Sequence, residues 1–200
     1  MTLNVCMVST HGYVDPVPQL GRTDTGGQVV YVLELAKALG RLGHRVDIYT
    51  RWIDKKEKQI EQIPGHANIR IIRMQAGPWQ FIRKEKIYSV LDDLSFRMTE
   101  FIKSENIAYD LFHGHYVDGG IVASEAAKIF GKPFVFTPHS LGAWKRAQMG
   151  GEEKQMEEEF HFNHRISEEL RLFSLADGLL LTTELQRDKI KELYGWNQGD

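Results

Sequence analysis

The sequence lacks the features of a disulfide-linked, membrane-spanning or nucleic-acid-binding protein. Its 200 residues include one cysteine, Cys6, which lies in an apolar run and is expected to be a buried packing residue. No apolar run approaches the roughly 18 residues of a transmembrane helix, and the first residues lack the regions of a signal peptide. The formal net charge of −2 provides no basic field for nucleic acid. We therefore expect a cytoplasmic protein that binds no nucleic acid and does not span a membrane.

The composition, 42% hydrophobic and 26% charged, is typical of one globular domain with a full core. Apolar runs alternate with amphipathic stretches along the chain. They predict strands at 3–9, 45–50, 68–74, 110–113, 133–137 and 178–181, and helices at 27–42, 84–104, 121–130, 152–176 and 184–194. The strand at 68–74 is expected near an edge of the sheet, and the charged stretch 54–65 is interpreted as a solvent-facing segment or short helix. This alternation predicts an α/β fold, a Rossmann-like parallel sheet with helices on both faces.

Polar residues follow the expected strands at their carboxyl ends. Parallel sheets bind ligands outside these ends, so we predict a functional site there. The residues concerned are His11 and Gly12 after the first strand, His115 and Asp118 after the fourth, His139 after the fifth, and Thr182 and Thr183 after the last.

The stretch 24–28, Asp-Thr-Gly-Gly-Gln, stands between a long loop and a strong helix pattern. Backbone amides at a helix start have no partners within the helix, and glycines there let an anion approach them closely. One interpretation is therefore a phosphate or sugar-phosphate site. The other is a capping box, in which Thr25 and Gln28 bond to each other's backbone amides. Both can hold together.

The motifs do not support a dinucleotide-binding site, a P-loop or a metal site. The Gly26-Gly27 element has neither the Gly-x-Gly-x-x-Gly spacing of a dinucleotide fold nor the Gly-Lys-Ser/Thr of a P-loop. His113 and His115 share one face of a strand, but no further ligand at tight spacing completes a metal site. We expect no cofactor and no metal.

Individual polar residues keep two interpretations each. His115 with Asp118 could orient a hydroxylated ligand, or His115 could simply fill a strand end. His139 could donate a hydrogen bond to a sugar hydroxyl or a carbonyl. Ser140 is expected mainly to cap a helix. The cations Lys84, Lys145 and Arg165 could hold a phosphate, although each alone is typical of a solvated surface.

Three ordered motifs resemble a known family. The stretches 24–36, 115–120 and 137–145 are similar to the amino-terminal domain of sucrose-phosphate synthase-type enzymes, which are retaining glycosyltransferases of family 4 with the two-domain GT-B architecture. The stretches 9–13 and 137–145 are especially similar to those of the bacterial mannosylfructose-phosphate synthases. The resemblance spans nearly the whole chain.

The resemblance implies a role for each matched residue. Gly26 and Gln28 would contact the acceptor sugar phosphate, and Gly27 would lie close to the diphosphate of the donor. His139 would face the transferred sugar across the cleft. Lys84 would bind the acceptor, and Lys145 and Arg165 would hold its phosphate. No pair of carboxylates of the glycosidase kind is required.

The implied activity is transfer of a hexose, with retention, from a UDP- or GDP-hexose to a sugar phosphate, with fructose 6-phosphate favoured. Residues 1–200 would form the acceptor-binding domain, inactive without a carboxy-terminal nucleotide-sugar-binding domain that is missing here. A sugar-phosphate-binding module without catalysis is the alternative. A flavodoxin-like regulatory domain is disfavoured, because it needs an acidic pocket where the chain has His11 and Gly12.

Overall fold

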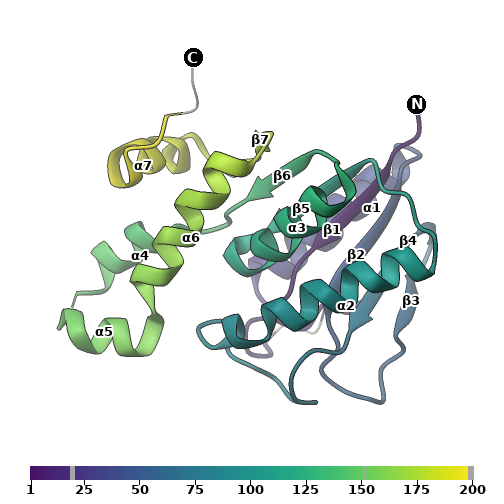
Figure 1. The fold of residues 1–200 in the computed structure, drawn as a ribbon, viewed down its shortest axis with the longest axis horizontal. Coiled ribbons are helices and arrows are strands. Elements are labelled where there is room, and N and C mark those ends of the chain that lie inside the picture. The colour runs from purple at the N-terminus through teal and green to yellow at the C-terminus, as the bar shows by residue number, and fades with distance from the viewer. Residues whose placement is uncertain (19–20, 151, 198–200) are drawn as a thin grey trace.

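The computed structural model describes residues 1–18, 21–150 and 152–197. Within them one sheet has the strand order β3-β4-β2-β1-β5-β6-β7 (Figure 1). Its strands are β1 (Asn4–Val8), β2 (Arg45–Arg51), β3 (Ile60–Ile63), β4 (His66–Met74), β5 (Leu111–His115), β6 (Phe134–Thr137) and β7 (Gly178–Leu179). Neighbouring strands are parallel except β3, which runs antiparallel to β4. The predicted Rossmann-like α/β sheet is confirmed.

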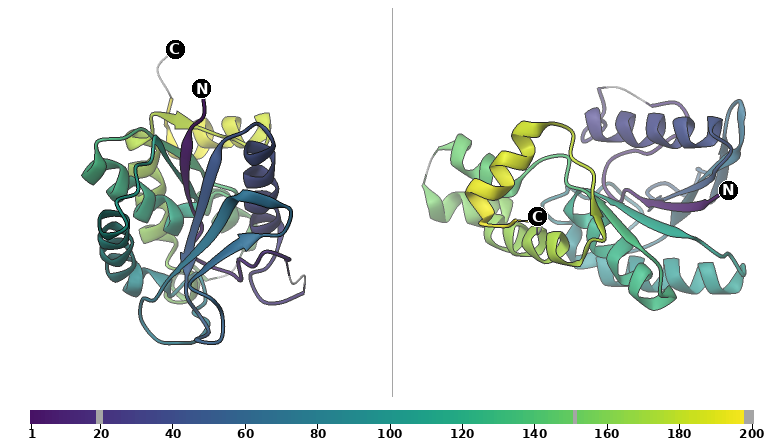
Figure 2. Two further views of the ribbon diagram at one scale, coloured as in Figure 1. Left: turned by 90° about the vertical axis from the view of Figure 1, so that its right-hand side faces the viewer. Right: turned by 90° about the horizontal axis from the view of Figure 1, so that it is seen from above.

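Helices cover both faces of this sheet. They are α1 (Gly27–Arg41), the 3-10 turn η1 (Ile87–Val90), α2 (Leu91–Ser104), α3 (Tyr116–Phe130), α4 (Gly142–Met149), α5 (Glu153–Phe160), α6 (Phe162–Leu175) and α7 (Glu184–Tyr194). Helix α1 lies on one side, and α2 and α3 lie on the other, as the view from above shows (Figure 2). The strand order reverses direction at β1, so β1 and β5 flank the switch point where such sheets bind ligands.

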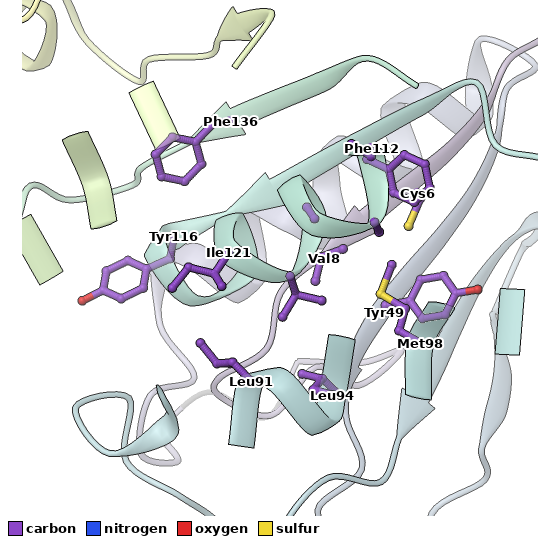
Figure 3. Close-up of a cluster of buried hydrophobic side chains, with 14 of the residues drawn as sticks. Cys6, Val8, Tyr49, Leu91, Leu94, Met98, Phe112, Tyr116, Ile121 and Phe136 are labelled. Atoms are coloured by element: carbon purple, nitrogen blue, oxygen red, sulfur yellow. The ribbon is translucent and has the colours of Figure 1, made fainter. Parts of the chain in front are cut away.

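Each face of the sheet has its own hydrophobic core. Alternate residues of β1 belong to different cores. Val5 and Met7 pack with α1, whereas Cys6 and Val8 point to the opposite face. There Cys6 and Val8 meet side chains of α2 and α3 such as Leu94 (Figure 3). Cys6 is buried as predicted, and burial raises the pKa of its thiol. No helix of the described residues is long and apolar enough to cross a membrane.

The expected element boundaries need correction at several places. The stretch 54–65 contains β3, which pairs outside β4 and makes β4 the second strand from the edge. The expected helix 84–104 divides into η1 and α2. Helix α3 begins at Tyr116, five residues before its expected start. Helix α4 was implied only by the expected cap at Ser140 and had no expected bounds.

The expected long helix at 152–176 is two helices. His161 has a left-handed φ of 50°, which ends α5 and begins α6 in a new direction. Residues 19–20 of the loop 10–26, residue 151, and residues 198–200 at the end of the chain lie outside the described residues.

Candidate functional site

The carboxyl ends of β1, β5 and β6 open into one cavity of about 280 Å³. Seven of the nine predicted site residues line it, and the other two, His115 and Asp118, are buried at the same strand end. The lining consists of His11, Asp24, Gly26, Gly27, Gln28, Lys84, Tyr116, His139, Ser140, Lys145 and Arg165. The fold thus brings together residues from five separate parts of the sequence: 11–28, 84, 116, 139–145 and 165.

Packing within the chain does not require glycine at either of the two positions that start α1, Gly26 and Gly27. Gly26 is the N-cap of α1 with an ordinary φ of −115°, and a Cβ placed on Gly26 or Gly27 would meet no atom within 4 Å. A side chain here would not clash with the fold but would stand over unpaired backbone amides beside the cavity. The glycines therefore leave those amides open to a ligand.

The capping-box interpretation of this stretch is wrong. No side chain caps α1, and the hydroxyl of Thr25 is buried without a hydrogen-bond partner among the described residues. Gln28 instead donates from Nε2 to Ser9 Oγ at 3.3 Å, which holds its side chain at the end of β1. Gln28 is thereby placed at the cavity wall.

Gly12 brings the loop 10–26 back over the end of β1. Its φ is +80°, and a Cβ at this position would lie 2.3 Å from the carbonyl oxygen of Asp24. Only glycine permits this contact. Asp24 in turn accepts a hydrogen bond from Lys84 Nζ at 2.5 Å, so two loops 60 residues apart in sequence meet at the cavity.

Two buried arginines at the carboxyl ends of β2 and β4 hold these loops. Arg51 donates to the carbonyl oxygens of Ala76 and Pro78 at 3.0 and 2.8 Å, and also to that of Gln80, which fixes the segment leading to Lys84. Arg73 pairs with Asp15 of the loop 10–26 at 2.9 Å and with Glu61 of β3 at 3.0 Å. Neither arginine was identified from the sequence.

Arg165 is a buried cation with several fixed contacts. Its Nε donates to Glu169 Oε1 at 2.8 Å, and its Nη2 donates to the carbonyl oxygen and Oγ of Ser140 at 2.9 and 3.0 Å. Burial alone would lower its pKa, but the charge of Glu169 and the ring of Tyr116 raise it. Its Nη1 makes no hydrogen bond to any described residue, which leaves a donor for a ligand.

The contacts of Arg165 also correct the expected role of Ser140. The N-cap of α4 is Leu141, with no side-chain hydrogen bond, so Ser140 binds Arg165 and does not cap the helix. Glu169 accepts from the amide of Gly142 at 2.9 Å. A Cβ on Gly142 would lie 3.0 Å from Arg165 Nε, so this glycine makes room for the pair.

Of the three cations, Lys145 has the charge that nearby carboxylates neutralise least. It has no ion-pair partner among the described residues, and its Nζ lies 5.3 Å from the centre of the Phe160 ring. Burial, together with the charges of Lys84 and Arg165, lowers its pKa. Lys84 pairs with Asp24 and Glu85, and Arg165 pairs with Glu169. Of the three cations that face this small cavity, Lys145 is therefore the one without a carboxylate partner among the described residues, which favours an anionic ligand.

The histidines of the site form two pairs. His11 Nδ1 lies 2.6 Å from Asp118 Oδ2, and His139 Nε2 lies 3.1 Å from His115 Nδ1. Burial and the nearby His11 lower the pKa of His139 to about 4, against the opposing charge of Asp118. Burial, then His113 and His139, lower the pKa of His115. Both rings of the second pair are neutral at pH 7.

Two glycines explain why Asp118 lies where it does. A Cβ on Gly119 would lie 2.4 Å from the carbonyl oxygen of Val8, and one on Gly120 would lie 2.7 Å from Phe136 and Leu172 side-chain atoms. Because Gly119 has no side chain, the first turn of α3 can pack against β1 and carry Asp118 to His11, and because Gly120 has none, the same turn can pack against Phe136 of β6 and Leu172 of α6.

The described residues contain no group of three His, Cys, Asp or Glu side chains arranged for a metal ion.

Three residues of the cavity wall have left-handed backbone conformations. The φ angles of Asp24, Tyr116 and His139 are 54°, 62° and 57°. Such angles are strained for residues with a side chain and cluster at functional sites. Tyr116 and Ser140 line the cavity but were not among the predicted site residues. The motif 115–120 could have indicated Tyr116, because it directly follows His115.

Comparisons with known proteins find a matching family model and similar sequences. The model of Glycosyltransferase Family 4 matches residues 25–199. The chain is 40% identical over 195 residues to the mannosylfructose-phosphate synthase of Agrobacterium fabrum, covering 96% of this chain and 42% of that protein. It is 36% identical over 180 residues to a probable sucrose-phosphate synthase of Thermosipho melanesiensis, covering 88% and 41%.

A solved structure extends the likeness to the fold. The sucrose-phosphate synthase of Thermosynechococcus elongatus superposes with a TM-score of 0.83 at 27% identity, over 98% of this chain and 46% of that one. This match confirms the predicted class, the Rossmann-like amino-terminal half of a GT-B fold. The chain spans less than half the length of each of these relatives.

Proposed function

The chain belongs to Glycosyltransferase Family 4, and on that premise we propose that it forms the acceptor-binding half of an enzyme that glycosylates a sugar phosphate. The donor is a nucleotide sugar, UDP- or GDP-hexose, and transfer retains the anomeric configuration. Fructose 6-phosphate is the favoured acceptor, because two relatives are named mannosylfructose-phosphate synthase and probable sucrose-phosphate synthase, and both names refer to the phosphate of a sugar that contains fructose. The nucleotide-sugar-binding half is a carboxy-terminal domain outside these 200 residues.

The observation that carries this proposal is the convergence of Lys84, Lys145 and Arg165 on one cavity. They come from a loop, from α4 and from α6, so only the fold can assemble them. Asp24 and Glu85 pair with Lys84 and Glu169 pairs with Arg165, so a phosphate group would supply the negative charge that Lys145 lacks. We assign Lys145 Nζ and the free Nη1 of Arg165 to its oxygens, since charge-assisted hydrogen bonds of this kind are the strong ones.

The remaining lining residues complete the acceptor and donor contacts. Gly26 and Gln28 contact the acceptor sugar, and Lys84 joins them from the opposite wall. Gly27 lies where the diphosphate of the donor meets the amides of α1, which stabilise the negative charge that develops as the diphosphate leaves. Retention then follows from attack on the same face of the sugar, with no carboxylate acting as nucleophile.

His139 faces the transferred sugar as a neutral hydrogen-bonding group, in keeping with its lowered pKa. His115 and Asp118 were expected to bind substrate, but both side chains are fully buried. We therefore assign them an indirect role. Asp118 holds the ring of His11, and His115 holds the ring of His139.

Two measurements test the proposal. Titration of the 200-residue chain with fructose 6-phosphate, fructose and inorganic phosphate should give binding that requires both the sugar and the phosphate. The protein that carries the carboxy-terminal domain should then release UDP or GDP from its donor only when a sugar phosphate is added. Release that no sugar phosphate stimulates would refute the acceptor class. Binding with no release under any donor would instead favour a non-catalytic sugar-phosphate-binding module.

A further inference from the structure

The geometry points to His115 as a positioning residue that fixes the proton of His139. We infer that His115 donates from Nδ1 to His139 Nε2, so that His139 keeps its own proton on Nδ1 and presents an N–H donor to the cavity. The tautomer is a property of this chain alone. Only the identity of the oxygen that accepts this hydrogen bond rests on the proposed function.

The two rings differ in what surrounds their nitrogens. His115 ends β5 and is fully buried, and its Nε2 is buried without a hydrogen-bond partner among the described residues. Its Nδ1 lies 3.1 Å from His139 Nε2. His139 Nδ1 makes no hydrogen bond to a described residue, and it is not among the buried unpartnered atoms, so it opens toward the cavity that His139 lines.

One proton lies between the two rings, and it can belong to either. If His139 donated it, neutral His115 would have to carry its proton on Nε2, where it would be buried with no acceptor. A buried N–H without a partner is costly and rare, more so than an acceptor that lacks a donor. The lower-energy arrangement places the proton on His115 Nδ1 and leaves its Nε2 bare.

The neighbouring groups preserve this arrangement at neutral pH. His115 contacts His113, with 4.0 Å between ring centroids, and His139 contacts Tyr31 at 5.0 Å. The nearby carboxylate, Asp118, is already bonded to His11 and to the amide of Gly119. Burial lowers the pKa of both rings, so neither carries a second proton. Each neutral ring carries one N–H proton. With His115 protonated on Nδ1 and donating to Nε2 of His139, the proton of His139 must therefore be on its Nδ1.

The consequence concerns what His139 can do to a ligand. A ring with its proton on Nδ1 donates to an oxygen lone pair in the cavity and cannot remove a proton from the same position. His139 therefore binds a hydroxyl or phosphate oxygen and does not act there as a general base. In the proposed reaction that oxygen belongs to a hydroxyl of the transferred sugar.

Nitrogen NMR of the histidine rings tests the inference in the chain without ligand. Two-bond ¹H–¹⁵N spectra distinguish a ring protonated on Nδ1 from one protonated on Nε2, and the His139→Gln variant identifies the resonances of His139. We expect the Nδ1–H form for both His115 and His139 at pH 7.5. An Nε2–H form of His139 would overturn the inference, even if no variant of His115 folds.

Variants of His115 add a causal test. His115→Asn places an amide N–H near the position of Nδ1 and should keep His139 in the Nδ1–H form. His115→Phe removes the donor and should shift His139 toward the Nε2–H form that histidine prefers in water. His113→Phe is the matched control, since His113 is a buried histidine of the same strand that bonds Thr137 and not His139. An unchanged tautomer in the His115→Phe variant would also overturn the inference.

These outcomes are separate from those of the proposed function. If fructose 6-phosphate fails to bind while His139 shows the Nδ1–H form, the acceptor assignment fails and the tautomer stands. If the sugar phosphate binds while His139 shows the Nε2–H form, the reverse holds.

Discussion

The two ends of the sheet both carry a cavity, and the larger one is not the candidate site. The cavity at the amino ends of the strands measures about 650 Å³, against about 280 Å³ at the carboxyl ends. In the larger cavity, Asp47 accepts two hydrogen bonds from Arg70, at 2.8 and 2.6 Å, and one from Tyr109 at 2.6 Å. Arg45 on its rim is exposed to water.

The difference lies in how the charges are paired. At the amino end the buried carboxylate has its partners within the chain, so nothing there calls for a ligand. At the carboxyl end Lys145 has no ion-pair partner among the described residues, and Arg165 keeps a free donor. Because an uncompensated charge is costly to bury, unpaired charge identifies the site better than volume does. Four experiments can break or sharpen this contrast.

The largest effect is expected from Arg165→Ala. The variant leaves Glu169 buried without its cation, which should lower the free energy of unfolding by about 3–5 kcal/mol. It should also weaken binding of fructose 6-phosphate by about 2–3 kcal/mol. Urea denaturation and calorimetric titration measure the two effects. Arg171→Ala, on the exposed side of the same helix, is the control and should change neither appreciably. Unchanged affinity would remove Arg165 from the site.

Acid should destabilise the carboxyl end through its histidines. The pKa of His139 falls to about 4 and that of His113 to about 3, from the usual 6.5, because both are buried. The unfolded chain therefore binds more protons between these values, and the free energy of unfolding should fall as the pH drops below about 6.5. The fall is up to about 1.4 kcal/mol per pH unit for each histidine.

Urea denaturation at pH 8, 7, 6 and 5 measures this slope. In the His139→Gln variant, the free energy of unfolding should fall less steeply with pH, because the contribution of one histidine is lost. A stability that does not change between pH 7 and pH 5 would show that these rings are protonated in the folded chain, and would weaken the view of a neutral His139.

A smaller effect, confined to binding, is expected from Lys145→Gln. Loss of a charge-assisted hydrogen bond should weaken binding of the sugar phosphate by about 1.5–3 kcal/mol. Stability should change little, because Lys145 has no ion-pair partner to lose. Calorimetric titration at two salt concentrations measures the effect, and Lys154→Gln on the exposed surface of α5 is the control. Equal affinity of both variants would mean that the unpaired cation does not bind the phosphate.

The smallest effect is expected at the amino end. Asp47→Asn weakens the hydrogen bonds from Arg70 and Tyr109, which should lower the free energy of unfolding by about 0.5–1.5 kcal/mol. Affinity for fructose 6-phosphate should stay the same, since the two cavities lie at opposite ends of the strands. A clear loss of affinity would show that the two ends are coupled and that the contrast drawn here is too simple.

The sequence was sufficient for the parallel strands of the sheet and, together with the family resemblance, for most of the cavity wall. Alternation along β1 and the apolar face of α1 depend on local periodicity, which the chain displays directly. The polar residues at strand ends had to converge once the strands were parallel. For this reason Gly26, Gln28 and His139 could be predicted to meet although they are far apart in sequence. Lys84, Lys145 and Arg165 do not follow strands directly, and they were assigned to the site only through the family resemblance.

What could not be predicted depends on partners elsewhere in the chain. Thr25 and Gln28 match a capping box, but the contact of Gln28 with Ser9 exists only after β1 and α1 meet. The strand β3 needs β4 beside it. The two buried arginines, Arg51 and Arg73, appear in the sequence as ordinary charges at strand ends, and only the folded loops reveal what they hold.

The three left-handed residues of the cavity wall place stability and activity in opposition. Asp24, Tyr116 and His139 each hold a backbone angle that glycine would adopt without strain, at a cost of about 1–2 kcal/mol per residue. A library of variants screened only for heat resistance should therefore gain glycine or asparagine at positions 24 and 139. At position 116 the buried ring of Tyr116 packs in the core, and its loss would offset the relief of strain. The same library screened for sugar transfer should keep the original side chains. Sequencing the two surviving pools would show which of these positions natural selection has maintained against the preference of the fold.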